Sequence, residues 1–309
     1  MPIKSHRTAQ KRKPKTSKSF WRYLLGFFGL ITLVFIAYLI LVPAKYWDGK
    51  SRLALAIQDK SGAVKLSVFD PQTESITVIT VPANTQVDVA RQLGEWKIGS
   101  VWKLGENEKI GGSIISETVT KTLRLPTEGW ADMGALGFTK DNNLAIWQSV
   151  IGAYKTNLSL KDRIGIAFFA QSVKSPQRNE IDLSQTPLLI RTKLSDGSLG
   201  YEVRDLSVAQ ISAYFADARI SEENIGVSIF YPRSRMQEVQ KLGEIIQILG
   251  VKVTSLELLT QDLVFNCKIV SQGNLTAKKI AEVFNCKTEI KNNQTGIQLL
   301  VGEEFFRRF

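Results

Sequence analysis

The chain of 309 residues has two cysteines, and both lie in its last fifth. Cys267 and Cys286 each stand in a Phe-Asn-Cys-Lys sequence. If a strand around Cys267 is followed by a helix that runs back beside it, the two thiols come within disulfide distance in an oxidising compartment. The alternative is a pair of buried, inert thiols that behave as small apolar side chains.

The single histidine, His6, lies in the N-terminal tail. No imidazole is therefore at hand for Cys267, Cys286 or a serine in the rest of the chain, which excludes Cys-His and Ser-His catalysis there. A zinc site built from cysteine and histidine is disfavoured for the same reason, so we expect no metal on such ligands.

An uncharged segment of 22 residues, residues 23–44, follows the tail. A helix of this length, at about 1.5 Å per residue, covers the roughly 30 Å core of a bilayer. We therefore predict a single transmembrane helix in contact with the lipid bilayer. The residues before it include eight cations and no acid, which predicts a cytoplasmic N-terminus and an extracytoplasmic bulk. A cleaved signal peptide is the alternative, since Val42-Pro43-Ala44 resembles a cleavage site, but its apolar run is usually shorter.

The positive charge of the chain is concentrated in the same tail. The net charge is +11, and the eight cations in residues 1–22 leave only +3 for the remainder. Membrane topology and anionic lipid explain such a tail, so we expect no nucleic-acid partner.

Residues 52–220 have the pattern of a mixed α/β domain. Apolar residues alternate with a period of two around Leu55, Leu66 and Val78, which predicts three short strands. Helical spacing takes over in residues 90–125, with a break at Gly111-Gly112, and predicts two helices packed on the sheet. Further on we expect a helix over residues 144–153, a capping box at Ser159 and Asp162, a polar loop over 174–187, a hairpin around Asp196-Gly197 and a short helix over 207–215.

Residues 224–309 form a second predicted unit with the order β-α-β-β-α-β. Its first helix is expected to end at Gly250, and Asn274 is expected to cap the second. A unit of this size folds as a two-layer domain with its helices on one face of the sheet.

The C-terminal unit resembles the LytR C-terminal domain. The resemblance is carried by a strand, Ile225-Gly-Val-Ser-Ile-Phe-Tyr, a helix ending in Leu249-Gly250-Val251-Lys-Val253, and a closing strand, Ile297-Gln-Leu-Leu-Val301-Gly302. The order of strands and helices before it resembles the LytR-CpsA-Psr family, also called cell envelope-related transcriptional attenuators. The predicted organisation is thus a basic tail (1–22), a transmembrane helix (23–44), a divergent LytR-CpsA-Psr-like domain (52–220) and a LytR C-terminal-like domain (224–309).

The family resemblance implies a phosphotransferase site, but its motif is substituted here. Where transferring members carry Ile-Pro-Arg-Asp-Thr, this chain reads Val81-Pro-Ala-Asn-Thr85, with Ala83 and Asn84 in place of the arginine and aspartate. Holding a pyrophosphate needs cations, and holding Mg²⁺ needs carboxylates. The arginine and the aspartate with which the family implies binding of phosphate and Mg²⁺ are therefore missing in this chain.

Two functional hypotheses follow from the resemblance. The first is a non-catalytic envelope protein that binds a wall polymer, a polyprenyl-linked lipid carrier or an envelope partner, without a cofactor. The alternative is an active Mg-dependent phosphotransferase that attaches glycopolymers from polyprenyl pyrophosphate to the cell wall. The candidate catalytic residues for the alternative are Lys60, Lys65, Asp88 and Arg91, with Asp59 on Mg²⁺.

Overall fold

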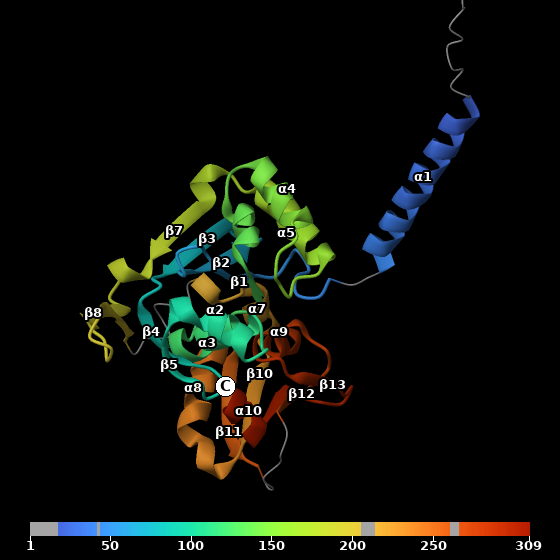
Figure 1. Cartoon of the computed structure of the whole chain (residues 1–309). Helices are drawn as coiled ribbons and strands as arrows, with labels where there is room; N and C mark the ends of the chain where they lie inside the picture. The colour runs from blue at the N-terminus through green and yellow to red at the C-terminus, as the bar shows by residue number, and fades with distance from the viewer. Residues whose placement is uncertain (1–17, 42–43, 205–213, 260–265) are drawn as a thin grey trace, which may run out of the picture. The chain divides into compact units, whose positions relative to one another are not determined.

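The computed structural model describes residues 18–41, 44–204, 214–259 and 266–309 (Figure 1). The helix α1, Lys18–Leu41, belongs to one unit, and the described residues from Ala44 to Phe309 form a second, compact unit. The predicted helix over residues 207–215 falls mostly outside the described residues.

The prediction of a transmembrane helix is wrong. Helix α1 takes in Lys18 and Arg22, which the prediction placed in the tail before the span, and it ends at Leu41 rather than Ala44. Within the described parts of the chain, no helix combines the length and the apolar character needed to cross a bilayer. The predicted location, a single-pass membrane protein with a cytoplasmic N-terminus and an extracytoplasmic bulk, depended on this span and is therefore wrong as well.

The first sheet of the compact unit has the strand order β6-β1-β2-β3-β7. Its strands are β1 (Leu53–Gln58), β2 (Val64–Asp70), β3 (Ser75–Val81), β6 (Gly129–Ala131) and β7 (Arg178–Asp182). The three predicted strands are confirmed as β1, β2 and β3, and both neighbouring pairs are antiparallel. Strands β6 and β7 run parallel to β1 and β3. Strand β7 contradicts the predicted loop over residues 174–187, because its polar residues form an edge strand against β3.

Helices cover both faces of this sheet. Ala54 and Ala56 pack with the buried residues of α2 (Ile98–Asn107) and α3 (Ser113–Leu123). Leu53, Leu55 and Ile57 pack on the opposite face with α4 (Asn143–Ile151) and α5 (Leu160–Ser172). Figure 1 shows the two helix pairs on opposite sides of β1–β3. Ala54 and Ala56, the small residues between the predicted apolar positions of β1, are buried as well. They are buried because helices cover both faces of the sheet, so neither face is open to solvent.

A second, four-stranded sheet has the order β5-β4-β9-β8. It contains β4 (Thr85–Val89), β5 (Gly94–Lys97), β8 (Leu189–Lys193) and β9 (Leu199–Val203). The hairpin predicted around Asp196-Gly197 is confirmed, since β8 and β9 pair antiparallel and Gly197 takes a positive φ of 82°. The capping box at Ser159 and Asp162 is also confirmed at the start of α5.

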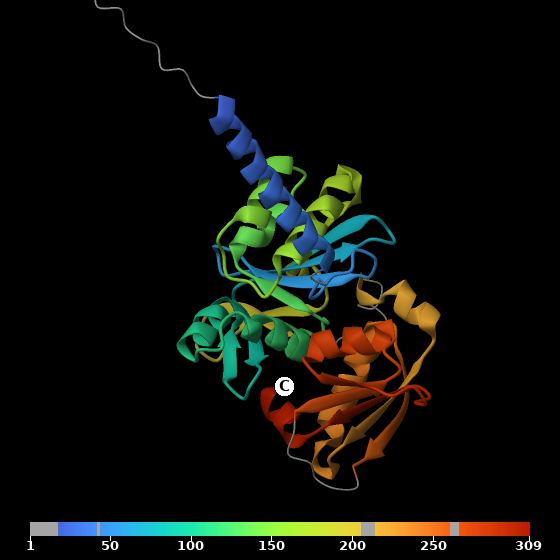
Figure 2. The ribbon, with the colours of Figure 1, turned by 90° about the vertical axis from the view of Figure 1, so that its right-hand side faces the viewer.

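The third sheet has the order β11-β10-β14-β12-β13 (Figure 2). Its strands are β10 (Gly226–Tyr231), β11 (Lys252–Leu258), β12 (Cys267–Ser271), β13 (Lys287–Ile290) and β14 (Ile297–Val301). The helices of this C-terminal part of the chain are α7 (Ala218–Glu223), α8 (Met236–Ile248), α9 (Leu275–Phe284) and α10 (Glu303–Arg308). The predicted β-α-β-β-α-β order is present, with β13 and α10 added. Short 3₁₀ helices complete the fold at Met133–Thr139, Ser175–Gln177, Leu183–Gln185 and Arg233–Arg235.

Candidate functional site

Asp59 and Lys60 lie in the tight turn between β1 and β2. The Asp59 carboxylate accepts hydrogen bonds from the backbone N–H of Ser61 at 2.8 Å, from the Ser61 hydroxyl at 2.6 Å and from the N–H of Ala63 at 3.1 Å. All three involve the same oxygen, Oδ1, so this side chain shapes the turn. Lys60 is exposed beside it.

Ala83 and Asn84, at the substituted motif, also serve the local backbone. The carbonyl of Ala83 accepts a hydrogen bond from the N–H of Gly99 at 3.0 Å. The Asn84 side-chain amide donates to the carbonyl of Leu199 at 3.1 Å. The two positions therefore link the β3–β4 connection to the start of α2 and to β9.

Asp88 and Arg91 form ion pairs with α3. Asp88 Oδ2 lies 2.8 Å from Lys121 Nζ. Arg91 binds Glu117 through two nitrogens, Nε at 2.7 Å and a terminal nitrogen at 2.8 Å. These bonds to Glu117 raise the pKa of the Arg91 guanidinium. Both residues therefore hold β4 and the following turn against α3.

The five candidate residues are not gathered at one site. Asp59 and Lys60 line a cavity beside Met133 and Tyr154, whereas Lys65, half-buried on β2, lines a different cavity. Among the described residues, no group of three or more acidic, histidine or cysteine side chains is placed to hold a metal ion. This geometry assembles no Mg²⁺-pyrophosphate clamp from the candidates.

Cys267 and Cys286 form a disulfide with a Cα–Cα distance of 4.9 Å. Cys267 starts β12, and Cys286 lies between the end of α9 and the start of β13. The bond closes the strand-helix-strand segment that forms one wall of the cavity described next.

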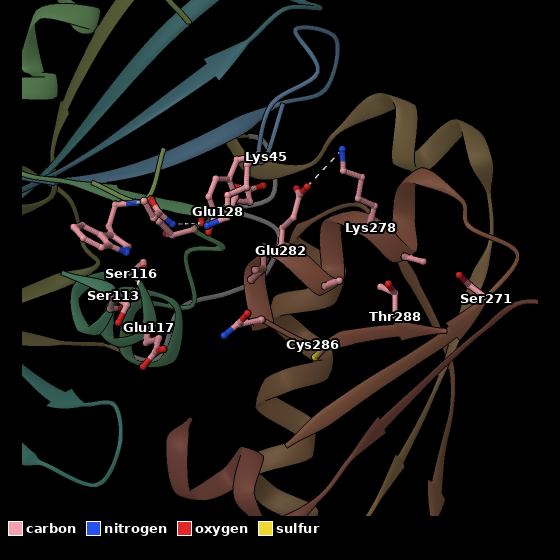
Figure 3. A pocket seen from close by; sticks show the side chains of 18 of the residues that line it. Lys45, Ser113, Ser116, Glu117, Glu128, Ser271, Lys278, Glu282, Cys286 and Thr288 are labelled. Atoms are coloured by element: carbon pink, nitrogen blue, oxygen red, sulfur yellow. Dashed lines mark hydrogen bonds and ion pairs between the residues drawn. The ribbon is translucent and has the colours of Figure 1, made fainter. Parts of the chain in front are cut away.

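A cavity of about 650 Å³ lies between the first part of the compact unit (residues 44–204) and its C-terminal part (residues 214–309); we call it the seam cavity (Figure 3). Figure 3 shows Ser113, Ser116 and Glu117 on one wall, and Glu282 and Thr288 across from them. Trp130 also lines it, and its position is fixed by edge contact with Trp102 at 5.6 Å between ring centroids.

Glu128 and Glu282 line the seam cavity, and the buried Lys279 lies within ion-pair distance of both; we call these three residues the buried charge cluster. Lys279 Nζ donates to the carbonyl of Arg52 at 2.7 Å and to Glu128 Oε1 at 3.4 Å. The other oxygen of Glu128 accepts the N–H of Ala54 at 2.8 Å. Lys279 therefore joins α9 to the start of β1 and to the segment before β6.

Glu282 is the least satisfied member of the cluster. Its carboxylate oxygens lie 3.7 Å from Lys278 Nζ and 3.6 Å from Lys279 Nζ, and neither oxygen has a hydrogen-bond partner among the described residues. Burial, together with the Glu128 carboxylate, raises the pKa of Glu282 to about 7, against the opposing effect of the two lysines. Burial disfavours the charge of Lys279, but the carboxylates of Glu128 and Glu282 keep its pKa above the usual value.

Asn274 precedes α9 as predicted, but its side chain makes no capping hydrogen bond. The carboxylate of Glu223 accepts the first N–H groups of the helix instead, from Leu275 and Thr276, each at 2.9 Å. Asn274 Oδ1 is buried without a hydrogen-bond partner among the described residues, and Asn274 lines the seam cavity. The Glu223 carboxylate of α7 thus takes the place of the expected Asn274 cap. The side-chain oxygen of Asn274 is left without a hydrogen bond among the described residues.

No protein-family model matches the chain, and no curated protein does either. The solved structures to which it is similar include Bacillus subtilis TagT, at 16% identity, with 67% of this chain and 94% of that chain covered and a TM-score of 0.39. A structure of TagT bound to LIIa-WTA has 17% identity, coverage of 67% and 94%, and a TM-score of 0.38. The putative transcriptional regulator ywtF from Bacillus subtilis has 16% identity, coverage of 68% and 95%, and a TM-score of 0.40.

At these identities and TM-scores the likeness carries no argument about the activity of this chain. The LytR-CpsA-Psr assignment therefore rests on the sequence resemblance, and the LytR C-terminal-like domain and its boundaries stay predictions.

Glu128, Lys279 and Glu282 are not among the residues predicted from the sequence. One pattern could have pointed to them: Lys279 lies between the buried Ala277 and Ile280 of α9, so a cation falls on the face of the helix that packs inward. A buried cation requires an acidic partner. Its identity could not be read from the pattern, because Glu128 is 151 residues away in the sequence.

Proposed function

We propose that this protein is a non-catalytic relative of the LytR-CpsA-Psr proteins and that it binds a cell-envelope polymer. The family part of this proposal is supported by the succession of strands, helices and the Val-Pro-Ala-Asn-Thr segment in the sequence. The binding part is supported by the polar seam cavity, which offers hydrogen-bonding side chains from both parts of the compact unit.

One observation carries the non-catalytic assignment: the candidate catalytic side chains that make polar contacts make them with the protein itself. Asp59 closes a turn, Asp88 binds Lys121, and Arg91 binds Glu117 through two nitrogens. Phosphoryl transfer depends on cations and metal ions that are already positioned for the phosphate oxygens. Arg91 would have to give up its two bonds to Glu117 before it could bind a phosphate, and removing one partner from such a pair is costly.

The substitutions at Ala83 and Asn84 act in the same direction. An alanine supplies no bidentate phosphate ligand, and a neutral asparagine binds Mg²⁺ less strongly than an aspartate does. Loss of a single preorganised donor at a transition state lowers a rate by about 10² to 10³, and here two family ligands are replaced together.

The experiment is an activity assay on the full chain. The purified protein is incubated with a polyprenyl pyrophosphate analogue and Mg²⁺, and release of phosphate or pyrophosphate is measured. We expect release at the rate of the protein-free control. Asp59→Ala and Arg91→Met are expected to leave that rate unchanged, because the wild-type chain is already expected to match the control.

Binding is tested separately by sedimentation with insoluble bacterial cell walls. The wild-type chain is expected to sediment with the walls in a saturable manner.

The two assays have separate contradicting outcomes. In the first assay, activity that depends on Mg²⁺ and disappears in Asp59→Ala would show that the protein is a phosphotransferase instead. A chain that neither hydrolyses the analogue nor sediments with the walls would contradict the polymer-binding part alone.

A further inference from the structure

The lining of the seam cavity contains hydrogen-bond acceptors that lack donors. Both carboxylate oxygens of Glu282 and Oδ1 of Asn274 are buried without a hydrogen-bond partner within the described residues. The Glu282 side chain is only 10% exposed. A buried acceptor without a donor lowers stability, so its presence at a cavity wall indicates a group that a ligand completes.

Hydroxyl groups on the opposite wall add to this surplus of acceptors. Ser113 Oγ donates to the carbonyl of Ile110 at 3.2 Å, and Ser116 Oγ donates to the carbonyl of Ser113 at 2.9 Å. Each hydroxyl proton is thus used within the protein, while the oxygen can still accept a hydrogen bond. Figure 3 shows both serines across the cavity from Glu282, so the acceptors face each other over the open space.

Trp130 adds an aromatic ring to the lining, which also includes Tyr46. The Trp130 ring is held by its edge contact with Trp102, and its backbone N–H donates to Asn157 Oδ1 at 2.8 Å. Gly112 lies directly against the ring, since a Cβ at this position would come within 2.3 Å of it. Trp102 and Gly112 therefore pack against the ring, and Trp130 contributes apolar surface to the lining beside the polar groups.

We infer that the seam cavity binds a saccharide unit, with two ligand hydroxyls donating to the Glu282 carboxylate and further hydroxyls reaching Asn274 and the serines of α3. This inference deepens the proposed binding function and rests on it. A saccharide carries many hydroxyl donors around a body with apolar C–H faces, which matches acceptors on two walls and aromatic rings in the lining. The volume of about 650 Å³ lies in the range of small-molecule sites and suits one or two sugar rings.

Other ligand classes fit the lining less well. A phosphate group needs cations, and those of the lining are already engaged. Arg308 donates to the carbonyl of Phe284 and lies 3.4 Å from Glu117, Lys278 lies 3.7 Å from Glu282, and Lys45 lies over the ring of Tyr46. A lipid chain would leave the oxygens of Glu282 and Oδ1 of Asn274 buried without a hydrogen bond, with Glu282 compensated only by the two lysines 3.6 and 3.7 Å away. A single ammonium group would satisfy Glu282 but could not also reach the serines on the other wall.

The experiment uses the full chain labelled with ¹⁵N, and it follows the indole N–H resonance of Trp130, assigned by its absence in Trp130→Phe. Cellobiose, maltose and N,N′-diacetylchitobiose are titrated separately. We expect at least one of them to shift the Trp130 resonance in a saturable manner. Inorganic phosphate and butylamine, titrated alone, are expected to leave it in place.

Glu282→Met is the decisive variant. It keeps the length of the side chain but removes both acceptors, and we expect it to weaken saccharide binding at least about tenfold, the effect of losing a hydrogen bond to a charged group. Because it also removes a buried, poorly paired carboxylate, its melting temperature is expected to equal or exceed that of the wild type. Glu222→Met makes the same replacement at an exposed position of α7 and is expected to bind like the wild type.

Thr288→Arg provides a second test that leaves the buried charge cluster intact. Thr288 is exposed on β13 and lines the cavity, so an arginine there fills the space and is expected to abolish the saccharide shift. The inference is overturned if none of the three disaccharides shifts Trp130, if Glu282→Met binds like the wild type, or if phosphate or butylamine alone produces the shift. Such a failure would not bear on the proposal that the protein is not a phosphotransferase. The assay with the pyrophosphate analogue tests that proposal independently.

Discussion

Lys279 Nζ lies 3.4 Å from Glu128 Oε1, although the two residues are 151 positions apart and each side chain is only 4% exposed. Lys279 also donates to the carbonyl of Arg52, so one ammonium group holds α9 against the start of the first sheet. An ion pair so deeply buried specifies one way of packing the two parts, and it makes each partner depend on the other.

Replacing Lys279 by methionine should therefore destabilise the fold strongly. The variant leaves the Glu128 carboxylate buried without its cation and removes one of the two cations beside Glu282, and we expect a loss of ~3 to 5 kcal/mol in the free energy of unfolding. Urea unfolding followed by circular dichroism measures it. Lys278→Met is the matched control one residue earlier: its side chain is 51% exposed, and its loss should cost no more than about 1 kcal/mol. Equal effects of the two variants would contradict the role assigned to Lys279.

The raised pKa of Glu282 predicts a dependence of stability on pH. Its pKa is about 7 in the folded chain, against an ordinary value of 4.5, so the folded state retains a proton that the unfolded state has lost. Its contribution to the free energy of unfolding therefore falls as the pH rises from about 4.5 to about 7, and it is constant above that range. Other carboxylates titrate too, so the quantity to measure is the stability of Glu282→Gln minus that of the wild type. We expect this difference to grow from pH 5 to pH 7.5, and a flat difference would refute the shift.

The disulfide should contribute substantially to stability. Cys267 and Cys286 are separated by 19 residues, and cross-linking a loop of this length lowers the entropy of the unfolded chain by the equivalent of ~3 kcal/mol. We expect dithiothreitol to lower the melting temperature of the wild type and to leave that of the Cys267→Ala/Cys286→Ala double variant unchanged. A wild-type protein that is insensitive to full reduction would show that the bond does not support the fold.

Asp59 should behave as a turn residue and not as a metal ligand. Its carboxylate accepts from Ser61 and from the N–H of Ala63, so Asp59→Ala should lower the free energy of unfolding by ~1 to 2 kcal/mol. Addition of Mg²⁺ should not change the melting temperature of either protein. Lys60→Ala, at the exposed neighbouring position, should be close to neutral. A Mg²⁺-dependent stabilisation that Asp59→Ala removes would return this residue to a metal site.

The sequence was most informative where a pattern is local. The alternation around Leu55, Leu66 and Val78 predicted β1, β2 and β3, and the turn at Asp196-Gly197 predicted the hairpin of β8 and β9, because both depend on neighbouring residues. Strand β7 was missed, since Arg178–Asp182 has little apolar character and is a strand only through its pairing with β3, about a hundred residues earlier. The apolar run of α1 predicted a span, but the helix takes in Lys18 and Arg22 as well.

The candidate site was harder to predict than the fold. Asp88 and Arg91 have the right chemistry for a phosphate site, but Lys121 and Glu117 on α3 already engage them. Which charges are already paired depends on tertiary contacts, and these have no local pattern. The same holds for Glu282, whose raised pKa reflects burial beside Glu128 from a distant segment.

Arg308, in α10, reaches back to the first part of the compact unit: its carbonyl accepts the N–H of Arg91, and its guanidinium lies 3.4 Å from Glu117. The contact with Glu117 joins positions 191 residues apart in the sequence. During synthesis on a ribosome, the turn after β4 therefore emerges long before the residue that completes its hydrogen bonds. Until residue 308 is available, the N–H of Arg91 and the carboxylate of Glu117 lack these two contacts. We expect this segment to reach its final packing only after residue 308 has been synthesised.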